Sequence, residues 1–224
     1  MKKKVICIIP ARGGSKGLKF KNLQKINNKP LIYYPIKAAI RSGVCDKVCV
    51  STDSIEIAKV AKKYGAEVPV LRKKKFSKDL TTTEETLKNA LIEFEEFYQT
   101  KFDICVFLAS TNVFRKISWI KEAVNILKKD NKYESAFSVH SIYKHFWHYK
   151  NEKFSKVSSW MKDYTSRQVG QKLYREDTGL ASASRASLWR KGKRIGKRVY
   201  FIVNDDSLTG IDIHNIHDLK LADF

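Results

Sequence analysis

The sequence predicts an α/β protein, a three-layer α/β/α sandwich around a mainly parallel, Rossmann-like sheet. Two observations indicate this fold. Short apolar runs of strand length alternate with amphipathic stretches of about 10–15 residues, as in parallel sheets whose strands are joined by helices. A glycine-rich turn follows the first apolar run, at the edge where open sheets of this kind bind ligands. With 224 residues, the chain suits one domain (1–224) with a substantial core.

The expected elements follow one another in a regular order. Strands are expected at 4–10, 47–52, 67–71, 103–111, 134–141 and 198–204. Helices are expected at 30–43, 54–65, 81–97, 118–129 and 217–224. Gly43 and Gly65 close the first two helices, and Thr82 with Glu85 is placed for a capping box at the start of the third.

Residues 142–172 break this pattern. The stretch is rich in aromatic residues, histidine and lysine, and has no clear period. We interpret it as an insertion or a dimerisation arm rather than another strand–helix unit.

The formal net charge of +21 is the most unusual feature of the composition. A nucleic-acid binder, an enzyme for polyanionic substrates, or a protein with merely solvated lysine faces would each carry such a charge. The absence of a helix-turn-helix, zinc-finger or RNA-recognition signature makes nucleic acid the weakest of these partners.

The cysteines and the apolar runs bear on location and metal binding. Cys7, Cys49 and Cys105 lie inside apolar runs, and Cys45 has no histidine or second cysteine pair nearby, so we expect buried free thiols rather than a metal site.

No apolar run approaches the roughly 20 residues that span a bilayer, and the first is shorter than a signal-peptide core of roughly 7–15 residues. We expect a cytoplasmic protein that is not associated with membranes.

The glycine-rich turn, ARGGSKG at 11–17, is the strongest chemical signal. Gly13, Gly14 and Gly17 are expected to let the backbone turn tightly and present N–H groups to an anion. Four cations add charge suited to a triphosphate: Arg12, Lys16, Lys19 and Lys21. The spacing matches neither GxxxxGK[ST] nor GxGxxG. The alternative is an ordinary β-turn with solvated lysines.

The stretch IPARGGSKGLKFKNL (9–23) resembles the signature of the CMP-sialic acid synthetase (acylneuraminate cytidylyltransferase) family, which includes the legionaminic and pseudaminic acid cytidylyltransferases. Weaker similarities follow in the right order at 29–40, 50–68, 71–91, 107–118, 166–179 and 210–223. The resemblance implies a fold of the nucleotide-diphospho-sugar transferase type with a small dimerisation and sugar-binding insertion. It also implies a homodimer in which the arm of one subunit reaches the sugar site of the other.

The reaction implied by the resemblance joins CTP and a 2-keto-3-deoxy sugar acid into a CMP-sugar and pyrophosphate, with Mg²⁺ (or Mn²⁺) as cofactor. The anomeric hydroxyl attacks the α-phosphorus, and preorganised cations stabilise the charge that gathers on the phosphate oxygens. The resemblance assigns catalytic roles to Arg12, Lys21 and Asp212. It assigns nucleotide binding to Ala11, Arg12, Gly13, Ser15, Lys16, Lys21, Asn22, Arg72 and Thr83. It assigns sugar binding to Lys144, Arg167 and Gln168.

Several of these residues have a structural alternative. Asn22 taken alone suits a helix cap or a turn. Arg115, in the family's TSPLR-like turn, is as easily structural as functional. Arg167 suits either a sugar carboxylate or an ion pair at a dimer interface.

Two positions depart from the family pattern. Ala109 stands where the family has a glutamine near the reacting sugar, so a polar contact is missing. His214 stands where the family has a second acidic residue beside Asp212. Because Mg²⁺ prefers hard oxygen ligands, Asp212 is the metal candidate, and His214 is a supporting group, a base toward the sugar hydroxyl, or a sign of lowered activity. Asp218 is expected to cap the last helix.

Three functions remain open from the sequence. The leading one is a cytidylyltransferase for a nonulosonic acid. The second is a related nucleotidyltransferase for another ulosonic or modified sugar. The third is a non-catalytic binder of nucleotide or nucleic acid, which the net charge and the two departures would suit.

Overall fold

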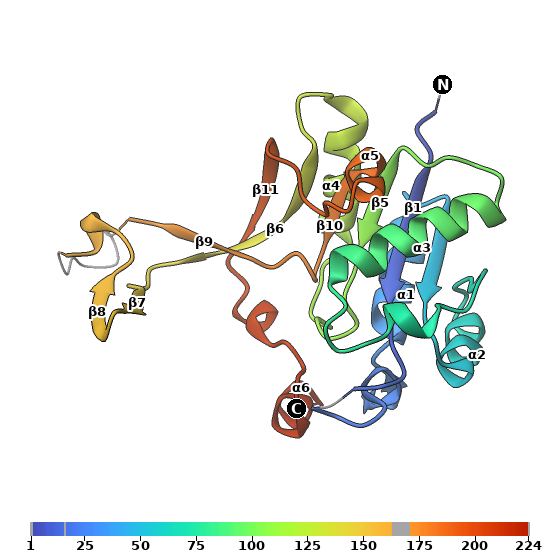
Figure 1. Cartoon of the computed structure of the whole chain (residues 1–224), viewed down its shortest axis with the longest axis horizontal. Coiled ribbons are helices and arrows are strands. Elements are labelled where there is room, and N and C mark those ends of the chain that lie inside the picture. Colours follow the sequence, from blue (N-terminus) through green and yellow to red (C-terminus); the bar gives the residue numbers. More distant parts are fainter. Residues whose placement is uncertain (1, 16, 163–170, 224) are drawn as a thin grey trace.

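The computed structural model describes residues 2–15, 17–162 and 171–223 and centres on one mixed sheet (Figure 1). The strands follow the order β11-β6-β10-β5-β1-β4, with β9 paired to β6. Their bounds are β1 Val5–Pro10, β4 Lys47–Ser51, β5 Ile104–Phe107, β6 Ser135–Ile142, β9 Leu173–Glu176, β10 Ser182–Arg185 and β11 Val199–Asn204.

The sheet is mainly parallel, as predicted. β1 pairs in parallel with β4 and β5, and β11 pairs in parallel with β6. β10 is antiparallel to both β5 and β6, and β9 is antiparallel to β6. Helical crossovers join β1 to β4 and β4 to β5, whereas β9 follows the β7–β8 hairpin in sequence and runs antiparallel to β6.

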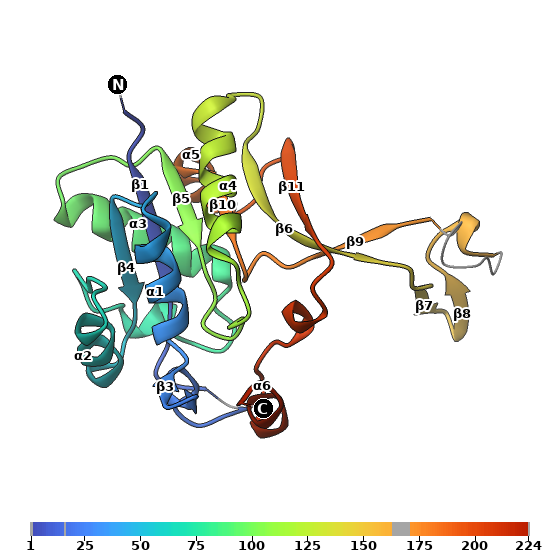
Figure 2. The ribbon, with the colours of Figure 1, turned by 180° about the vertical axis from the view of Figure 1, so that it is seen from behind.

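Helices cover both faces of the sheet. Their bounds are α1 Tyr33–Ser42, α2 Ile55–Lys63, α3 Thr83–Phe97, α4 Ile117–Lys129, α5 Ala186–Arg190 and α6 Ile216–Asp223. Side chains alternate along β1, so Val5 and Cys7 pack with α1, α2 and α4, whereas Ile6 and Ile8 pack with α3 and α5. Figures 1 and 2 show these helix layers from opposite sides. The predicted three-layer sandwich is confirmed.

A third, smaller apolar cluster joins the two ends of the chain. Ile26 and Leu31, in and beside a short hairpin of β2 Lys25–Ile26 and β3 Lys29–Pro30, pack against Ile213, Leu219 and Ala222. Helix α6 therefore docks beside the chain that follows β1, as both faces of the ribbon show (Figures 1 and 2).

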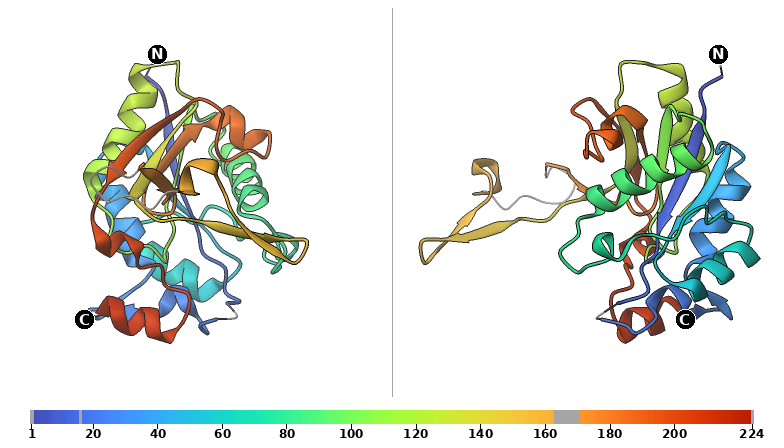
Figure 3. Two further views of the ribbon diagram at one scale, coloured as in Figure 1. Left: turned by 90° about the vertical axis from the view of Figure 1, so that its left-hand side faces the viewer. Right: turned by 45° about the vertical axis from the view of Figure 1, so that its right-hand side comes forward.

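Residues 143–162 and 171–172 belong to an arm that extends from the body at the far ends of β6 and β9 (Figure 3). Within it, β7 Trp147–Lys150 and β8 Lys153–Lys156 pair as an antiparallel hairpin, followed by the 3-10 turn η3 Ser159–Lys162. Residues 163–170 lie outside the described residues. The interpretation as an insertion rather than another strand–helix unit fits this hairpin.

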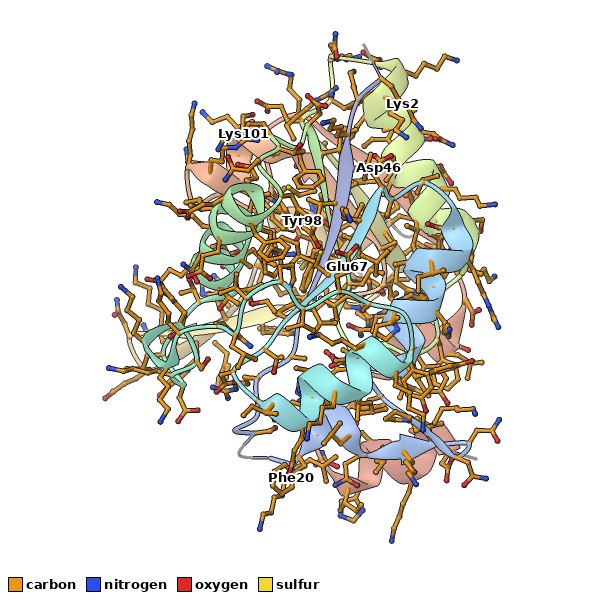
Figure 4. The ribbon with its side chains drawn as sticks, turned by 90° about the vertical axis from the view of Figure 1, so that its right-hand side faces the viewer. Lys2, Phe20, Asp46, Glu67, Tyr98 and Lys101 are labelled. Atoms are coloured by element: carbon orange, nitrogen blue, oxygen red, sulfur yellow. The ribbon has the colours of Figure 1, made fainter. Side chains whose placement is uncertain are left out.

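One predicted strand is wrong. Residues 67–71 contribute only an isolated bridge between Glu67 and Cys49. Pro69 has no N–H and cannot extend a ladder. The Glu67 carboxylate instead accepts hydrogen bonds from the Tyr98 hydroxyl at 2.5 Å and from Lys47 Nζ at 2.9 Å. Figure 4 shows Glu67 and Tyr98 side by side at the edge of the sheet.

The local helix signals agree with the structure. Gly43 and Gly65 follow α1 and α2 with φ of 65° and 95°, in the left-handed region that favours glycine. Thr82 and Glu85 form the predicted capping box at the start of α3. Asp218 takes part in the cap of α6, as predicted, together with Asn215. The Asn215 side chain accepts from the backbone of His217 and Asp218, and the Asp218 carboxylate accepts from the Asn215 amide in return.

The four cysteines are free, and three are buried, in agreement with their expected role as apolar packing residues. The described residues contain no helix long and apolar enough to cross a membrane.

Glu95 of α3 provides a test of the packing between α3 and α5. Its buried carboxylate accepts hydrogen bonds from Arg190, from Lys101 Nζ at 2.9 Å and from the Phe102 amide at 3.0 Å. Burial acts to raise the pKa of Glu95, but the hydrogen bonds from Arg190 and Phe102 outweigh it and hold the pKa below its ordinary value of 4.5.

We predict that Glu95→Gln lowers the free energy of unfolding at pH 7 by roughly 3 kcal/mol, because it leaves Arg190 without its anionic partner. A carboxylate with a lowered pKa stabilises the fold above its ordinary pKa and loses that effect as pH falls through the folded-state pKa. Urea unfolding should therefore show the gap between wild type and variant narrowing below about pH 4.5. Glu96→Gln on the exposed side of α3 is the matched control, and an equal loss in both variants would contradict the assignment.

Candidate functional site

The candidate site lies at the carboxyl ends of β1, β4 and β5. In Figure 4, Lys2, Asp46 and Lys101 mark the opposite end, where these strands begin, and Phe20 marks the end where the signature loop (residues 11–23) lies. Parallel strands bring their carboxyl ends to one edge, which is why segments distant in sequence meet here.

The start of the signature loop is held by the chain after β4. The Ala11 amide donates to the Ser51 carbonyl at 2.9 Å, and the Gly13 amide donates to Asp53 Oδ1 at 2.9 Å. Arg12 Nη1 lies 2.9 Å from Asp79 Oδ1. Arg12 therefore stands at the edge of the sheet with its charge balanced by a carboxylate.

Asn22 connects two loops. Its Nδ2 donates to the Arg12 carbonyl at 3.0 Å, and its Oδ1 accepts from Ser110 Oγ at 2.5 Å. The side chain is buried. Asn22 is thus neither a simple turn residue nor a cap, because it joins the signature loop to the loop after β5.

Arg72 is a buried cation behind the signature loop. It donates to the Ser51 carbonyl at 3.1 Å and to the Phe76 carbonyl at 3.5 Å. Burial lowers the pKa of Arg72, and the nearby Asp53 carboxylate opposes this shift. Its Nε has no hydrogen-bond partner among the described residues.

The terminal segment, residues 211–218, packs directly on the signature loop. Ile213 is buried, its amide donates to the Thr111 carbonyl at 3.1 Å, and its carbonyl accepts from Lys21 Nζ at 3.2 Å. A Cβ on Gly17 would lie 2.6 Å from the His214 carbonyl oxygen. Position 17 therefore requires glycine, because any side chain there would collide with the backbone of the terminal segment.

This packing corrects the expectation that the signature glycines serve to turn the chain. Neither Gly13 nor Gly17 is among the glycines with positive φ, and the Gly13 N–H is already bound by Asp53. A Cβ added to Gly14 would meet no heavy atom within 4 Å.

Lys21 and Asp212 face each other across this contact. Burial lowers the pKa of Lys21, and the Asp212 carboxylate opposes this shift. His214 Nε2 lies 3.1 Å from Asp212 Oδ2, whereas the buried Asp212 Oδ1 has no partner among the described residues. Asp218 accepts from the His214 and Asn215 amides at 2.8 and 3.0 Å and so fixes the backbone of this segment.

Arg115 has a structural role. Its Nη2 donates to the carbonyls of Ala109 and Gly179, the latter at 3.0 Å, and ties the loop after β5 to the turn before β10. Burial lowers its pKa to about 9. Ala109, which stands where the family has a glutamine, belongs to the same loop-to-turn contact. Its amide donates to the Gly179 carbonyl at 2.9 Å.

A pocket of about 360 Å³ opens beside Asp212. Its lining residues are Asn112, Arg175, Glu176, Asp177, Thr178, Gly179, Thr209, Gly210 and Asp212. Arg175 points its charge into this region and is paired with Asp177 through two hydrogen bonds of 2.9 and 3.0 Å. The sequence reasoning missed Arg175, although it lies eight residues after Arg167 in the same motif.

The structure brings most of the predicted residues to one edge of the sheet. These are Ala11, Arg12, Gly13, Ser15, Lys21, Asn22, Arg72 and Asp212. Thr83 is the exposed first residue of α3, and no described contact joins it to the signature loop. Lys144 is exposed in the arm, shortly after β6, and no described contact joins it to Asp212. Lys16, Arg167 and Gln168 lie outside the described residues.

Comparison with known proteins agrees with this arrangement. A sequence model of the family described as "Cytidylyltransferase" matches residues 6–208. The "Post-translational flagellin modification protein B" of Campylobacter coli is 30% identical over 223 residues, covering 98% of this chain and 94% of that protein. The "CMP-N,N'-diacetyllegionaminic acid synthase" of Campylobacter jejuni is 32% identical over 223 residues, with the same two coverages, 98% and 94%.

Two solved structures show the same fold at low sequence identity. One is a CMP:2-keto-3-deoxy-manno-octonic acid synthetase complexed with CTP, with a TM-score of 0.71 and 15% identity over 98% of this chain and 97% of that one. The other is a 4-diphosphocytidyl-2C-methyl-D-erythritol synthase from Anaerococcus prevotii, with a TM-score of 0.69 and 12% identity over 99% and 97%. The chain belongs to the cytidylyltransferase family and is a nucleotidyltransferase by descent.

Proposed function

We propose that the protein transfers a cytidylyl group from CTP to a nonulosonic, sialic-acid-like sugar acid and releases pyrophosphate. The observation that carries this proposal is the meeting of Lys21 with Asp212 at the carboxyl edge of the sheet, beside a pocket large enough for a sugar. The relatives named for legionaminic and pseudaminic acid cytidylyl transfer support this class of sugar.

The cations of the signature loop suit the triphosphate. Arg12 and Lys21 lie close enough to interact electrostatically, and Lys21 is partly desolvated. A desolvated cation interacts more strongly with a phosphate than a solvated one does. Residues proposed for the triphosphate are Ala11, Arg12, Gly13, Ser15, Lys16 and Lys21, and those proposed for the nucleoside are Asn22, Arg72 and Thr83.

In the proposed reaction, the anomeric hydroxyl of the sugar attacks the α-phosphorus while pyrophosphate leaves. Negative charge gathers on the phosphate oxygens, where Arg12 and Lys21 stabilise it. The Asp79 carboxylate now paired with Arg12 must give way to phosphate for this to occur. Buried Arg72 and Asn22 hold the loop that presents these groups.

Asp212 suits a divalent metal such as Mg²⁺ or Mn²⁺. Its buried Oδ1 has no partner among the described residues, and such a carboxylate oxygen is a hard ligand. No group of three or more His, Cys, Asp or Glu side chains stands ready for a metal in the described parts of the chain, so nucleotide phosphates and water would complete the coordination. A bound metal would neutralise charge on the phosphates.

We predict that purified protein releases pyrophosphate only when CTP, a nonulosonic acid and a divalent metal are all present. Arg12→Ala should lower kcat/KM by about 100-fold, because it removes a charge from the phosphate site. Arg41→Ala, at an exposed position near the end of α1, removes the same charge elsewhere and should stay within about twofold of wild type. A wild-type protein that releases no pyrophosphate with any acid of this class would overturn the proposed function.

The histidine beside Asp212 yields a second prediction. His214 Nε2 contacts Asp212 Oδ2. A carboxylate in place of this imidazole would add a second hard oxygen ligand for Mg²⁺. We expect His214→Asp to lower the Mg²⁺ concentration needed for half-maximal turnover by about tenfold. His214→Gln, which removes the imidazole without adding a carboxylate, is the control. A large fall in turnover with unchanged Mg²⁺ dependence in both variants would instead make His214 a participant in the reaction.

We further propose that the protein is a homodimer and that a second copy covers the arm. The hairpin exposes large aromatic side chains, Tyr149 at 62% and Phe154 at 71% exposure. Their ring centroids lie 4.7 Å apart in a tilted arrangement. Exposed apolar patches of this kind mark interaction sites. Lys144 lies in the same arm. The contact with sugar that we propose for Lys144, Arg167 and Gln168 would then be made in the site of the partner subunit.

Light scattering after size-exclusion chromatography tests the dimer. Wild type should have the mass of two chains, and the double variant Tyr149→Ser/Phe154→Ser should have the mass of one. Phe97→Ser, which removes an exposed ring from α3 outside the arm, should leave the mass unchanged. A monomeric wild type, or a double variant that remains dimeric, would refute this assignment.

A further inference from the structure

Asn112 lines the pocket beside Asp212 and belongs to a loop that is fixed to the terminal segment. The carbonyl of the preceding residue, Thr111, accepts from the Ile213 amide at 3.1 Å. Residues 112 and 212 thus lie next to the two partners of one backbone hydrogen bond, and both line the pocket. Asn112 therefore has a defined place beside the proposed sugar site.

Asn112 is also the uncharged polar side chain of this pocket that has no partner among the described residues. The other two uncharged polar side chains in the lining are Thr178 and Thr209. The Thr178 hydroxyl accepts from Arg194 Nη1 at 2.6 Å, and the Thr209 hydroxyl donates to Asn204 Oδ1 at 3.0 Å. The Asn112 carboxamide makes no hydrogen bond within the described parts of the chain, so it is available to a ligand.

The orientation of the Asn112 carboxamide depends on Gly179. A Cβ on Gly179 would lie 2.0 Å from Asn112 Oδ1 and 3.0 Å from the Ala109 Cβ. Oδ1 therefore lies against the bare Cα of this glycine, and Nδ2 is the donor left for a ligand. Gly179 is itself fixed, because its carbonyl accepts from the Ala109 amide at 2.9 Å and from Arg115 Nη2 at 3.0 Å.

The charged groups of the pocket leave a role for a neutral donor. Glu176 and Asp212 are carboxylates, which accept hydrogen bonds and therefore suit sugar hydroxyls. Arg175, the sole cation among the described lining residues, already donates to both oxygens of Asp177, at 2.9 and 3.0 Å. The carbonyl oxygen of an acylamino group accepts but cannot donate, so a carboxylate is a poor neighbour for it. Asn112 Nδ2 is a neutral donor of the kind that this oxygen requires.

We propose, as a consequence that rests on the proposed function, that Asn112 donates a hydrogen bond to the acyl carbonyl of an N-acylated sugar acid. Gly179, by lacking a side chain, keeps the carboxamide in the orientation that this bond needs. The two residues together set a preference for sugar acids that carry an acylamino group over those that carry a hydroxyl in its place. A hydroxyl is shorter and brings no carbonyl to the oriented donor, which is then left unpaired.

The test compares an N-acylated nonulosonic acid with its analogue in which a hydroxyl replaces the acylamino group. We expect wild type to prefer the N-acylated acid in kcat/KM by roughly 10-fold, and Asn112→Ala to lose most of this preference. Asn112→Asp keeps the shape of the side chain but puts an acceptor in place of Nδ2, and should lose it as well. The KM for CTP should stay within about twofold of wild type in both variants.

Gly179→Ala tests the orientation separately, because its Cβ would displace the Asn112 carboxamide without removing it. It should lower the preference for the N-acylated acid as Asn112→Ala does. The double variant should lose no more than either single variant, since both changes act on one hydrogen bond. Asn125→Ala, which removes an exposed carboxamide from α4, is the matched control and should keep the wild-type preference.

The proposal is overturned if both Asn112 variants or Gly179→Ala keep the wild-type preference, or if Arg175→Ala abolishes it while they do not. A wild type that turns over both acids equally well would also overturn it and would leave the proposed function intact. A wild type that turns over neither acid with CTP would defeat the proposed function itself, and this proposal with it.

Discussion

The contact between the signature loop and the terminal segment is the constraint on which the site depends. Gly17 allows the His214 carbonyl to approach closely, and the buried Ile213 side chain fills a small apolar cluster beneath it. The Ile213 backbone is bound on one side by Lys21 and on the other by Thr111. Asp212 is thereby placed at the carboxyl edge of the sheet by side chains and backbone from segments that lie far apart in sequence.

This contact also arranges the charges of the site. Two arginines at this edge already have partners, Asp79 for Arg12 and the Ser51 carbonyl for Arg72. These partners offset part of the positive charge of the site. A substrate phosphate that binds Arg12 would replace the Asp79 carboxylate. The net charge of +21 does not define the site, since the residues that build it are few and most lysines lie elsewhere on the surface.

The sequence predicted the layers, the parallel core of the sheet and the edge that carries the site, because these depend on local periodicity and on the position of the signature loop. It misjudged residues 67–71, where Pro69 prevents a ladder, and the signature glycines, whose role depends on the approach of the terminal segment. Arg175 could not be recognised from its place in a strand. Its function as a pocket residue depends on Asp177 and Gly210, which come together only through the pairing of β9 with β6 and the fold of the terminal segment.

A crystal structure of the protein with CTP and a nonulosonic acid would test the central claim most directly. That claim is that the signature loop holds the triphosphate beside Asp212 and that the adjacent pocket holds the sugar. The account predicts triphosphate oxygens against Arg12 and Lys21, the sugar in the pocket that Asp212 lines, and the anomeric hydroxyl facing the α-phosphorus. A triphosphate bound away from the signature loop, or a sugar bound outside this pocket, would contradict it.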